Sequence, residues 1–379
     1  MSFKNIPYQS LKELQQVCLK QHIPFASYRL PLQTEITTFV QYHSFPKKFD
    51  FTKLPESLQG FVIAPFFETA SCSPFILEPD DVFTSGDITP EFIMSLSEIN
   101  LFLDTEKPSV DNLTTTTRDE FISQVNEAKH AMNDGIFHKV VLSKIRVQQI
   151  PDTFDASTFY LRLCEKYPHA FVSMIQLPEV GCWIGATPEP LLLIEDGKVE
   201  TVSLAGTQLA TGNEIDAYSW SDKEIEEQGI VTGFVEKTLK SLKIKNYTLN
   251  GPANYQAANL IHLKTSFEFN EKDMGSRLPD FLKALHPTPS VGGLPKEAAR
   301  TFILDHENYN RTYYTGFLGP VHMEGNSRLF VNLRCLQLFD KKVVLYSGAG
   351  ITASSVAERE WEETDNKMLT MLNVMNSTI

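Results

Sequence analysis

Two ionisable residues stand where the sequence predicts apolar surroundings, and such residues can do acid–base chemistry. Lys139 is the first, in a strand-like run over residues 137–147. With a period of two, it shares a face with Phe137, Val141 and Ile145. A desolvated lysine has a pKa below its usual value of about 10.4 and can act as a general base. A lysine near a strand end that extends its amine to water is the alternative.

Glu189 is the second such residue. It lies between Pro188 and Pro190, just before an apolar run at 191–194. The two prolines fix the backbone on either side, so the side chain has little freedom. A carboxyl group in apolar surroundings can stay protonated and act as an acid. A polar turn residue is the alternative interpretation.

Carboxylates on two expected helices could form a site for a hard cation. Glu227 lies on the apolar stripe of a helical run over residues 222–242, and the closing helix carries Glu360, Glu363 and Lys367 on one face. Inward carboxylates without nearby His or Cys are typical of the oxygen-ligand sites that Mg²⁺ uses. A salt bridge at Glu227 and a surface row of ion pairs on the closing helix are the alternatives.

Arg334 and a glycine-rich segment could bind carboxylates of a ligand. In the strand-like run 330–339, Arg334 shares a face with Leu336 and Leu338. Half-buried guanidinium groups bind planar anions, although a protein carboxylate is an equally good partner. Gly348-Ala349-Gly350 follows the next strand, where backbone N–H groups could cradle a carboxylate or simply form a turn. The whole inventory suits a dianionic substrate held through a hard metal ion.

Helices and antiparallel strands must position these residues. A helix begins at Thr117, where Glu120 completes a capping box, and ends at Gly135. The other expected elements are a strand at 137–147, hairpins at 171–204 with a tight turn at Asp196-Gly197, a helix at 222–242, strands at 329–339 and 342–347, and the closing helix. Strand pairs separated by helices, without regular βαβ spacing, predict an α+β fold with antiparallel sheets, and no linker divides the chain.

The overall composition excludes several classes of protein. The 379 residues carry a formal charge of −13, which argues against nucleic acid or an anionic membrane as the main partner. Five scattered cysteines without a CxxC pair indicate neither a disulfide framework nor a zinc site. Residues 1–20 lack an apolar signal region, and no run reaches the length of a membrane span. A cytoplasmic protein is expected.

Six ordered motifs resemble those of the chorismate-utilising enzymes, and within them the isochorismate synthases. The motifs are the segments 137–144, 185–189, 203–207, 223–228, 286–289 (His-Pro-Thr-Pro) and 360–364. The similarity runs over about residues 118–375, while the first 115 residues match only loosely. It implies a single chorismate-binding domain over 1–379, built from large antiparallel sheets packed in layers with outer helices.

The resemblance also implies roles for individual residues. Lys139 would be the base that activates water, and Glu189 the acid at the departing hydroxyl. Glu227 and Glu363 would hold Mg²⁺, with Glu360 beside them. The residues implied to bind or line the chorismate substrate are Ala205, Gly206, Thr207, His262, Ser290, Tyr314, Arg334, Gly348, Ala349, Gly350 and Lys367.

Other branches of the family that this sequence resembles differ from it at particular positions. Anthranilate synthases typically carry glutamine where Lys139 stands, and aminodeoxychorismate synthases a lysine where Ala205 stands. Both are disfavoured, and no amidotransferase subunit is expected. Salicylate synthases share the Lys/Glu pair but usually lack the His-Pro-Thr-Pro segment at 286–289, which favours hydration alone. Ser290 departs from the alanine common in isochorismate synthases and leaves some pyruvate elimination open.

A catalytically silent chorismate-binding subunit is the last alternative. Such a protein would be expected to have lost one of Lys139, Glu189, Glu227 or Glu363, and all four are present. The sequence does not distinguish menaquinone from siderophore biosynthesis as the use of the isochorismate, and menaquinone is slightly preferred.

Overall fold

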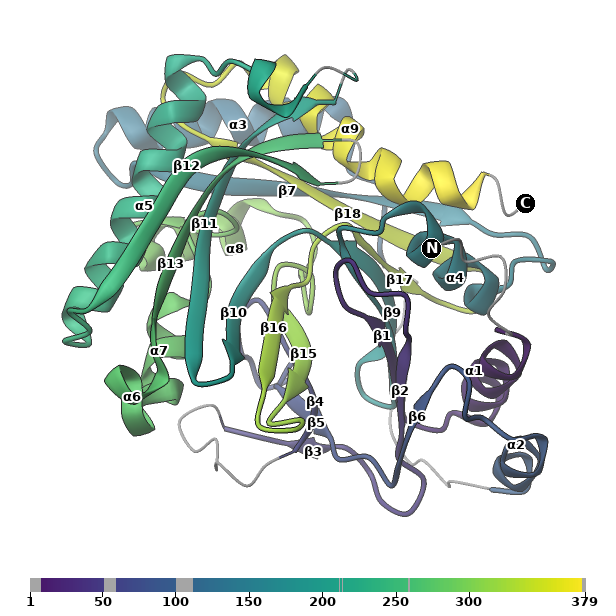
Figure 1. The fold of residues 1–379 in the computed structure, drawn as a ribbon. Helices are drawn as coiled ribbons and strands as arrows, with labels where there is room; N and C mark the ends of the chain where they lie inside the picture. The colour runs from purple at the N-terminus through teal and green to yellow at the C-terminus, as the bar shows by residue number, and fades with distance from the viewer. Residues whose placement is uncertain are drawn as a thin grey trace.

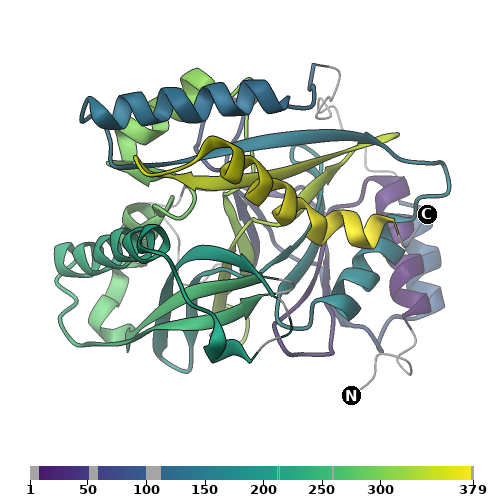
Figure 2. The same cartoon turned by 90° about the horizontal axis from the view of Figure 1, so that it is seen from above.

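Two antiparallel sheets face each other, and helices lie against their outer faces (Figure 1; Figure 2). The structure, a computed structural model, describes residues 8–50, 59–99, 112–210, 212, 214–257 and 260–376. Every strand pair in these residues is antiparallel. The predicted α+β class with large layered antiparallel sheets is therefore confirmed.

Each sheet has nine strands in the described residues. In spatial order, the first contains β14 (Gly293–Leu294), β7 (Lys139–Gln149), β18 (Lys342–Ile351), β17 (Cys335–Leu338), β9 (Gly181–Thr187), β8 (Phe171–Leu177), β1 (Phe25–Arg29), β2 (Thr37–Val40) and β6 (Asp81–Thr84). The second contains β12 (Tyr247–Ala257), β13 (Leu260–Asn270), β11 (Lys198–Leu209), β10 (Pro190–Glu195), β16 (Ser327–Val331), β15 (Phe317–Val321), β4 (Gly60–Ala64), β5 (Phe75–Leu77) and β3 (Lys47–Lys48).

The helices bury the outer faces of the sheets. They are α1 (Gln9–Gln21), α2 (Pro90–Ser97), α3 (Arg118–Asn133), α4 (Ala156–Lys166), α5 (Asp222–Ser241), α6 (Glu271–Met274), α7 (Leu278–Leu285), α8 (Lys296–His306) and α9 (Ala357–Met375), with 3₁₀ turns at Ile215–Ala217 and Gly275–Arg277. Helices α3 and α8 pack beside β7, while α5 and α7 share a core with the second sheet. A separate core, which includes Trp183 and Phe330, fills the space between the sheets.

The loosely matched N-terminal part contributes strands to both sheets. β1, β2 and β6 extend the first sheet, while β3, β4 and β5 extend the second. Strand β4 pairs with β15 from the last third of the chain. The described residues of this part therefore share the hydrogen-bonding network of the C-terminal elements. The first seven residues, where no signal region was expected, lie outside the described residues.

Local sequence signals correctly predicted several element boundaries. Helix α3 begins with the capping box of Thr117 and Glu120. The hairpin between β10 and β11 turns at Asp196 and Gly197, whose φ angles of 50° and 74° fit a left-handed two-residue turn. Helix α5 runs from Asp222 to Ser241, one residue short of the expected end.

Two predictions about the last third were wrong. The run 329–339 is not one strand, because β16 ends at Val331 in the second sheet and β17 begins at Cys335 in the first. Apolar residues continue on both sides of the crossing, at 329–331 and at 335, 336 and 338, so their pattern conceals it. Gly348-Ala349-Gly350 is not a turn or a curled nest, since it lies inside β18 and pairs in register with Leu142 and its neighbours in β7.

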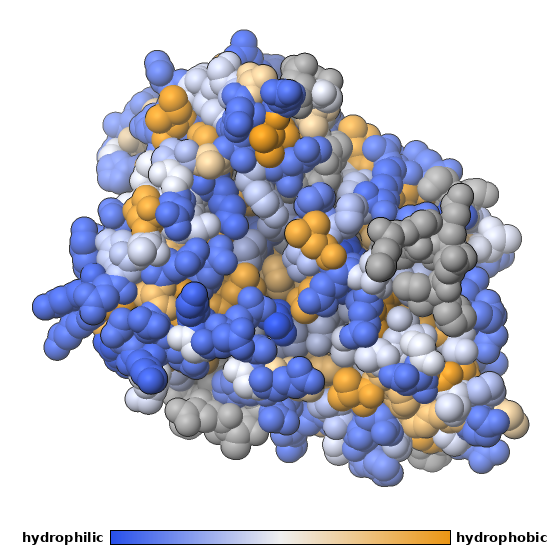
Figure 3. Space-filling view, viewed as in Figure 1, coloured by the Kyte–Doolittle hydropathy of each residue, from blue (hydrophilic) through white to orange (hydrophobic). Residues whose placement is uncertain are grey.

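The face seen in Figure 3 is mostly hydrophilic, with apolar side chains in separate small groups. Scattered apolar residues of this kind are normal on protein surfaces. None of the helices in the described part of the chain combines the length and apolar character that a bilayer span requires.

Candidate active site

The chain crosses between the two sheets at two neighbouring points, and each crossing carries a predicted site residue. Glu189 lies in the crossing from β9 to β10, and Arg334 in the crossing from β16 to β17. Backbone hydrogen bonds join the crossings, because the Val331 N–H donates to the Glu189 carbonyl (2.9 Å) and the Ala186 N–H donates to the Arg334 carbonyl (3.0 Å). The fold thus holds both side chains in one place from segments about 145 residues apart.

A cavity opens beside these crossings, with about 660 Å³ of atom-free space that includes its mouth. The predicted site residues on its wall are Glu189, Ala205, Gly206, Thr207, Glu227, His262, Ser290, Tyr314, Arg334, Gly348, Gly350, Glu363 and Lys367. Residues far apart in the sequence therefore converge on one cavity.

Three predicted residues lie off this wall. Lys139 is fully buried behind the wall and forms an ion pair with Glu227, which lines the cavity. Ala349 alternates with the wall-lining glycines of β18, so its methyl group packs into the core under α3 and α8. A ligand could meet only its backbone. Glu360 is also almost fully buried, on the first turn of α9.

Lys139 forms an ion pair with Glu227 of α5, with 2.8 Å between Nζ and Oε1. Burial alone would raise the pKa of Glu227, but the positive charges of Lys139, Lys223 and Lys367 outweigh it and hold that pKa below its usual value. Gly350 provides the space for this pair, since a Cβ there would lie 2.2 Å from Glu227 Oε1. The missing side chain on β18 is thus what lets the carboxylate approach the amine.

We expect Gly350→Ala to lower kcat by about tenfold or more, because the methyl group would displace the Glu227 carboxylate, a predicted metal ligand, from its place on the cavity wall. Steady-state kinetics and a thermal melt would check this. Gly229→Ala on α5 is the matched control, as its Cβ meets open space. That control should keep wild-type kcat and gain up to about 1 kcal/mol of stability. Wild-type kcat in Gly350→Ala would show that the position of Glu227 does not matter.

Glu189 has the environment of an acid. Its side chain is buried, and burial raises its pKa to about 7 against the opposing effect of Lys139, Lys367 and Arg334. The carboxyl is therefore half protonated near neutral pH rather than fully ionised. A protonated carboxyl was one of the two interpretations of Glu189 from the sequence, and it rested on the apolar run at 191–194.

Arg334 is a half-buried cation that is open to an anionic ligand. No carboxylate in the described part of the chain lies within ion-pair distance, and its Nη1 is buried without a hydrogen-bond acceptor. Burial lowers the pKa of its guanidinium to about 10, which still leaves it charged at neutral pH. Its φ of 47° is uncommon for a residue other than glycine. Strain of this sort is typical of functional positions.

Gly206 and His262 shape another part of the cavity wall. The register of β11 against β13 shifts between Ala205 and Gln208, and Gly206 takes a φ of 66° within this bulge. The Gly206 carbonyl accepts a hydrogen bond from His262 Nδ1 at 2.7 Å, and burial lowers the pKa of the imidazole to about 3. The ring is therefore neutral, and its buried, unpartnered Nε2 is an acceptor for a ligand hydroxyl.

Ser290 and Lys367 are held by backbone carbonyls. The Ser290 hydroxyl donates to the Leu204 carbonyl at 2.8 Å, which fixes its proton away from the cavity. The Lys367 ammonium donates to the Gly348 carbonyl at 2.9 Å and pairs with Glu363 at 2.6 Å. An anion at Lys367 would share the ammonium with these two oxygens.

The three predicted metal ligands are each paired with a lysine. The pairs are Lys139–Glu227 (2.8 Å), Lys223–Glu360 (2.5 Å) and Lys367–Glu363 (2.6 Å). In the described residues, no three acidic, His or Cys side chains converge closely enough to hold a metal as they stand.

The donor chemistry nevertheless fits a hard divalent cation. Glu360 Oε2 is buried without a hydrogen-bond partner, and the pKa of this carboxyl is raised by burial and then by the charge of Glu363. A divalent cation held by these carboxylates would relieve both costs, and carboxylate oxygens are the ligands that Mg²⁺ prefers.

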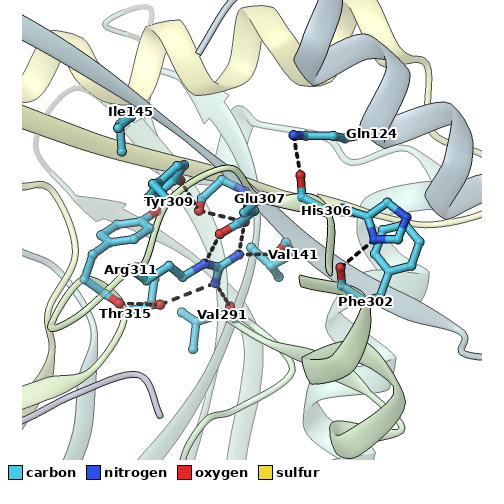
Figure 4. Close-up of polar contacts among 12 residues, drawn as sticks. Gln124, Val141, Ile145, Val291, Phe302, His306, Glu307, Tyr309, Arg311 and Thr315 are labelled. Atoms are coloured by element: carbon cyan, nitrogen blue, oxygen red, sulfur yellow. Dashed lines mark hydrogen bonds and ion pairs between the residues drawn. The ribbon is translucent and has the colours of Figure 1, made fainter. Parts of the chain in front are cut away.

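A buried network that no sequence pattern singled out supports the cavity wall. In Figure 4, the Arg311 guanidinium lies against the Glu307 carboxylate and the carbonyls of Val291 (3.0 Å) and Val141 (2.7 Å). Val141 and Val291 both line the cavity. The i,i+4 spacing of Glu307 and Arg311 was a signal for the pair, but an exposed helix gives the same spacing. Lys223 was likewise left without a role.

Comparisons with known proteins agree with this arrangement. A family model described as chorismate binding enzyme matches residues 90–376. The isochorismate synthase EntC of Escherichia coli (strain K12) is 30% identical over 242 residues, which are 62% of each chain, so less than two thirds of that relative is matched. The putative isochorismate synthase MenF of Mycobacterium tuberculosis (strain CDC 1551 / Oshkosh) is 30% identical over 274 residues, or 68% of this chain and 73% of that one.

A solved structure has the same fold over nearly the whole chain. It is that of a putative 2,3-dihydroxybenzoate-specific isochorismate synthase, DhbC, from Bacillus anthracis, with a TM-score of 0.76, 23% identity, and coverage of 97% of this chain and 99% of that one. Fold, site geometry and the extent of the family match agree. The chain belongs to the chorismate binding enzyme family.

Proposed function

We propose that the protein is a Mg²⁺-dependent isochorismate synthase that converts chorismate to isochorismate. One observation carries the proposal: a buried, half-protonated Glu189 faces the same cavity as the unpaired Arg334, within electrostatic reach of Lys139. A reaction that releases hydroxide needs such an acid, and a substrate with two carboxylates needs such cations. The relatives named isochorismate synthase support the choice of reaction.

The reaction exchanges one hydroxyl for another. Water adds at ring C2, the two ring double bonds shift, and the C4–O bond breaks, so that one water is consumed and one is released. Lys139 would take the proton of the attacking water, and Glu189 would donate its proton to the departing oxygen. No redox step and no covalent intermediate are required.

Residues around the cavity would orient the substrate for this exchange. Arg334 and Lys367 would hold the carboxylates, and His262 Nε2 would accept a hydrogen bond from a hydroxyl. Glu227, Glu360 and Glu363 would hold Mg²⁺. Bound there, Mg²⁺ would polarise the substrate carboxylate as a Lewis acid, and its charge would compensate that of Glu227. Glu227 would then stabilise the ammonium form of Lys139 less, and a lysine can act as a base only when its amine is uncharged.

Product analysis tests the proposal. The pure protein is mixed with chorismate, with Mg²⁺ or with EDTA, and the products are separated by chromatography while pyruvate is assayed. Isochorismate without pyruvate, formed only with Mg²⁺, is the expected result. Salicylate with pyruvate would make the protein a salicylate synthase, and no product would favour a silent binding subunit. Full activity in EDTA would remove the metal from the account. A location in the cytoplasm and activity without an amidotransferase subunit stay predictions.

A further inference from the structure

Lys223 is a cation at the predicted metal carboxylates that the proposed reaction does not use. It lies in the first turn of α5, four residues before Glu227, and therefore on the same helix face. Its ammonium lies 2.5 Å from Glu360 Oε1. The Glu360 side chain is 2% exposed, whereas that of Lys223 is 23% exposed. A buried carboxylate is thus neutralised by a lysine that still has access to solvent.

The Lys223 ammonium pairs with Glu360, one of the three predicted metal ligands. Glu360 still keeps one buried oxygen, Oε2, without a hydrogen-bond partner. The carboxylate set therefore has room for a stronger cation than one ammonium.

The other two lysines are fixed in ways that Lys223 is not. Lys139 is fully buried in β7, and Lys367 is also bound to the Gly348 carbonyl. Among the described hydrogen bonds and ion pairs, Glu360 is the single partner of the Lys223 amine. Of the three, Lys223 loses least when it leaves its carboxylate, because water can solvate the released ammonium.

We propose that Lys223 is an internal counter-ion that competes with the divalent cation for these carboxylates and leaves them when the cation binds. This rests on the proposed function, which places Mg²⁺ at the site. Its consequence is that Lys223 weakens cation binding and limits the site to cations strong enough to displace an ammonium. Removal of the amine should therefore tighten binding of the metal alone, without substrate.

Metal affinity of the full chain tests the competition. Mn²⁺ binding is followed by the spectroscopic signal of the free ion, and Mg²⁺ binding by calorimetry, both without chorismate. Lys223→Met, which keeps the stem and removes the charge, should bind about tenfold tighter than the wild type. Lys223→Arg keeps the charge and should not bind tighter. Lys237→Met, at an exposed lysine on the same helix, is the matched control and should not change affinity. Equal or weaker binding by Lys223→Met would overturn the proposal.

Amine labelling of the wild type gives a second measurement that does not depend on a folded variant. The protein is acetylated briefly with and without Mg²⁺, and labelling at each lysine is read by mass spectrometry. Mg²⁺ should increase labelling of Lys223 severalfold relative to Lys237. Unchanged or reduced labelling would contradict its release. If the wild type forms isochorismate with Mg²⁺ while both tests fail, only this inference is lost. If the wild type binds neither metal, the metal part of the proposed function fails as well.

Discussion

Replacement of Lys139 by alanine is expected to lower kcat by about 100-fold or more, which is the usual scale for loss of a general base. Lys139 is fully buried and carries the amine closest to Glu227. Without it, the attacking water has no group of suitable type at this position. Steady-state kinetics with isochorismate as the measured product check the expectation. Wild-type turnover in Lys139→Ala would remove this residue from the mechanism.

The loss of kcat must be separated from a loss of folding. Removal of Lys139 leaves the Glu227 carboxylate without its nearest cation, which by itself destabilises the fold. Lys144→Ala is the matched control, because Lys144 is also buried in β7 but pairs with Asp365, outside the cavity wall. This control should lose stability in a urea titration and keep a kcat near that of the wild type. A chorismate affinity that survives in Lys139→Ala would show that the cavity remains intact.

Glu189→Gln is expected to lower kcat by about 100-fold or more, since the amide cannot donate a proton to the departing hydroxyl. The wild type should also lose kcat/KM as pH rises through about 7, because burial raises the pKa of Glu189 to that value and the acid form is lost above it. This descending limb should be absent in the variant. Glu195→Gln, at the exposed end of β10, is the control and should keep both the wild-type kcat and the descending limb of the pH profile. A variant with the wild-type rate would exclude Glu189 as the acid.

The Glu189 carboxyl should also make the free energy of unfolding depend on pH. Because its pKa is raised in the folded state, this dependence has the opposite sign from that of a carboxylate whose pKa is lowered by a salt bridge. The pKa of Glu189 is about 7 in the folded state against an ordinary value of 4.5, so the folded state binds the extra proton in this window. Its contribution to the free energy of unfolding is therefore fully present below pH 4.5 and is lost as pH rises through 7, on the order of 3 kcal/mol. Relative to the wild type, Glu189→Gln should gain stability between pH 5 and pH 8. A constant difference across this range would contradict the burial of a neutral acid.

Elements with strong local signals could be predicted from the sequence. The capping box at Thr117 and the Asp196-Gly197 turn depend on neighbouring residues alone, and both were predicted correctly. The crossing at Arg334 was missed, since it depends on which sheet each half of an apolar run joins. The position of the Gly348-Ala349-Gly350 segment was missed for a similar reason, because its pairing partner lies in β7, about 200 residues earlier.

The site itself was only partly readable. The apolar surroundings of Lys139 could be predicted from the period of its strand, and those of Glu189 from the apolar run at 191–194, and both side chains are buried in the structure. Their convergence with His262 and Arg334 came from the resemblance to a family, as no local pattern relates these positions. The Lys139–Glu227 and Lys223–Glu360 pairs were not predicted, since an ion pair between two separate elements leaves no trace in the spacing within either of them. The spacing on the closing helix did allow the Lys367–Glu363 pair, as the ion-pair alternative to a metal site.

In the proposed reaction, Lys139 and Glu189 replace one hydroxyl of chorismate by another that comes from water. Running the reaction in water enriched in ¹⁸O and locating the label in the product by mass spectrometry tests this replacement. One ¹⁸O atom in each isochorismate, at the new C2 hydroxyl, is the predicted result. Isochorismate that carries no label would show that the original hydroxyl migrates, and would contradict the assignment of a base for water and an acid for the leaving group.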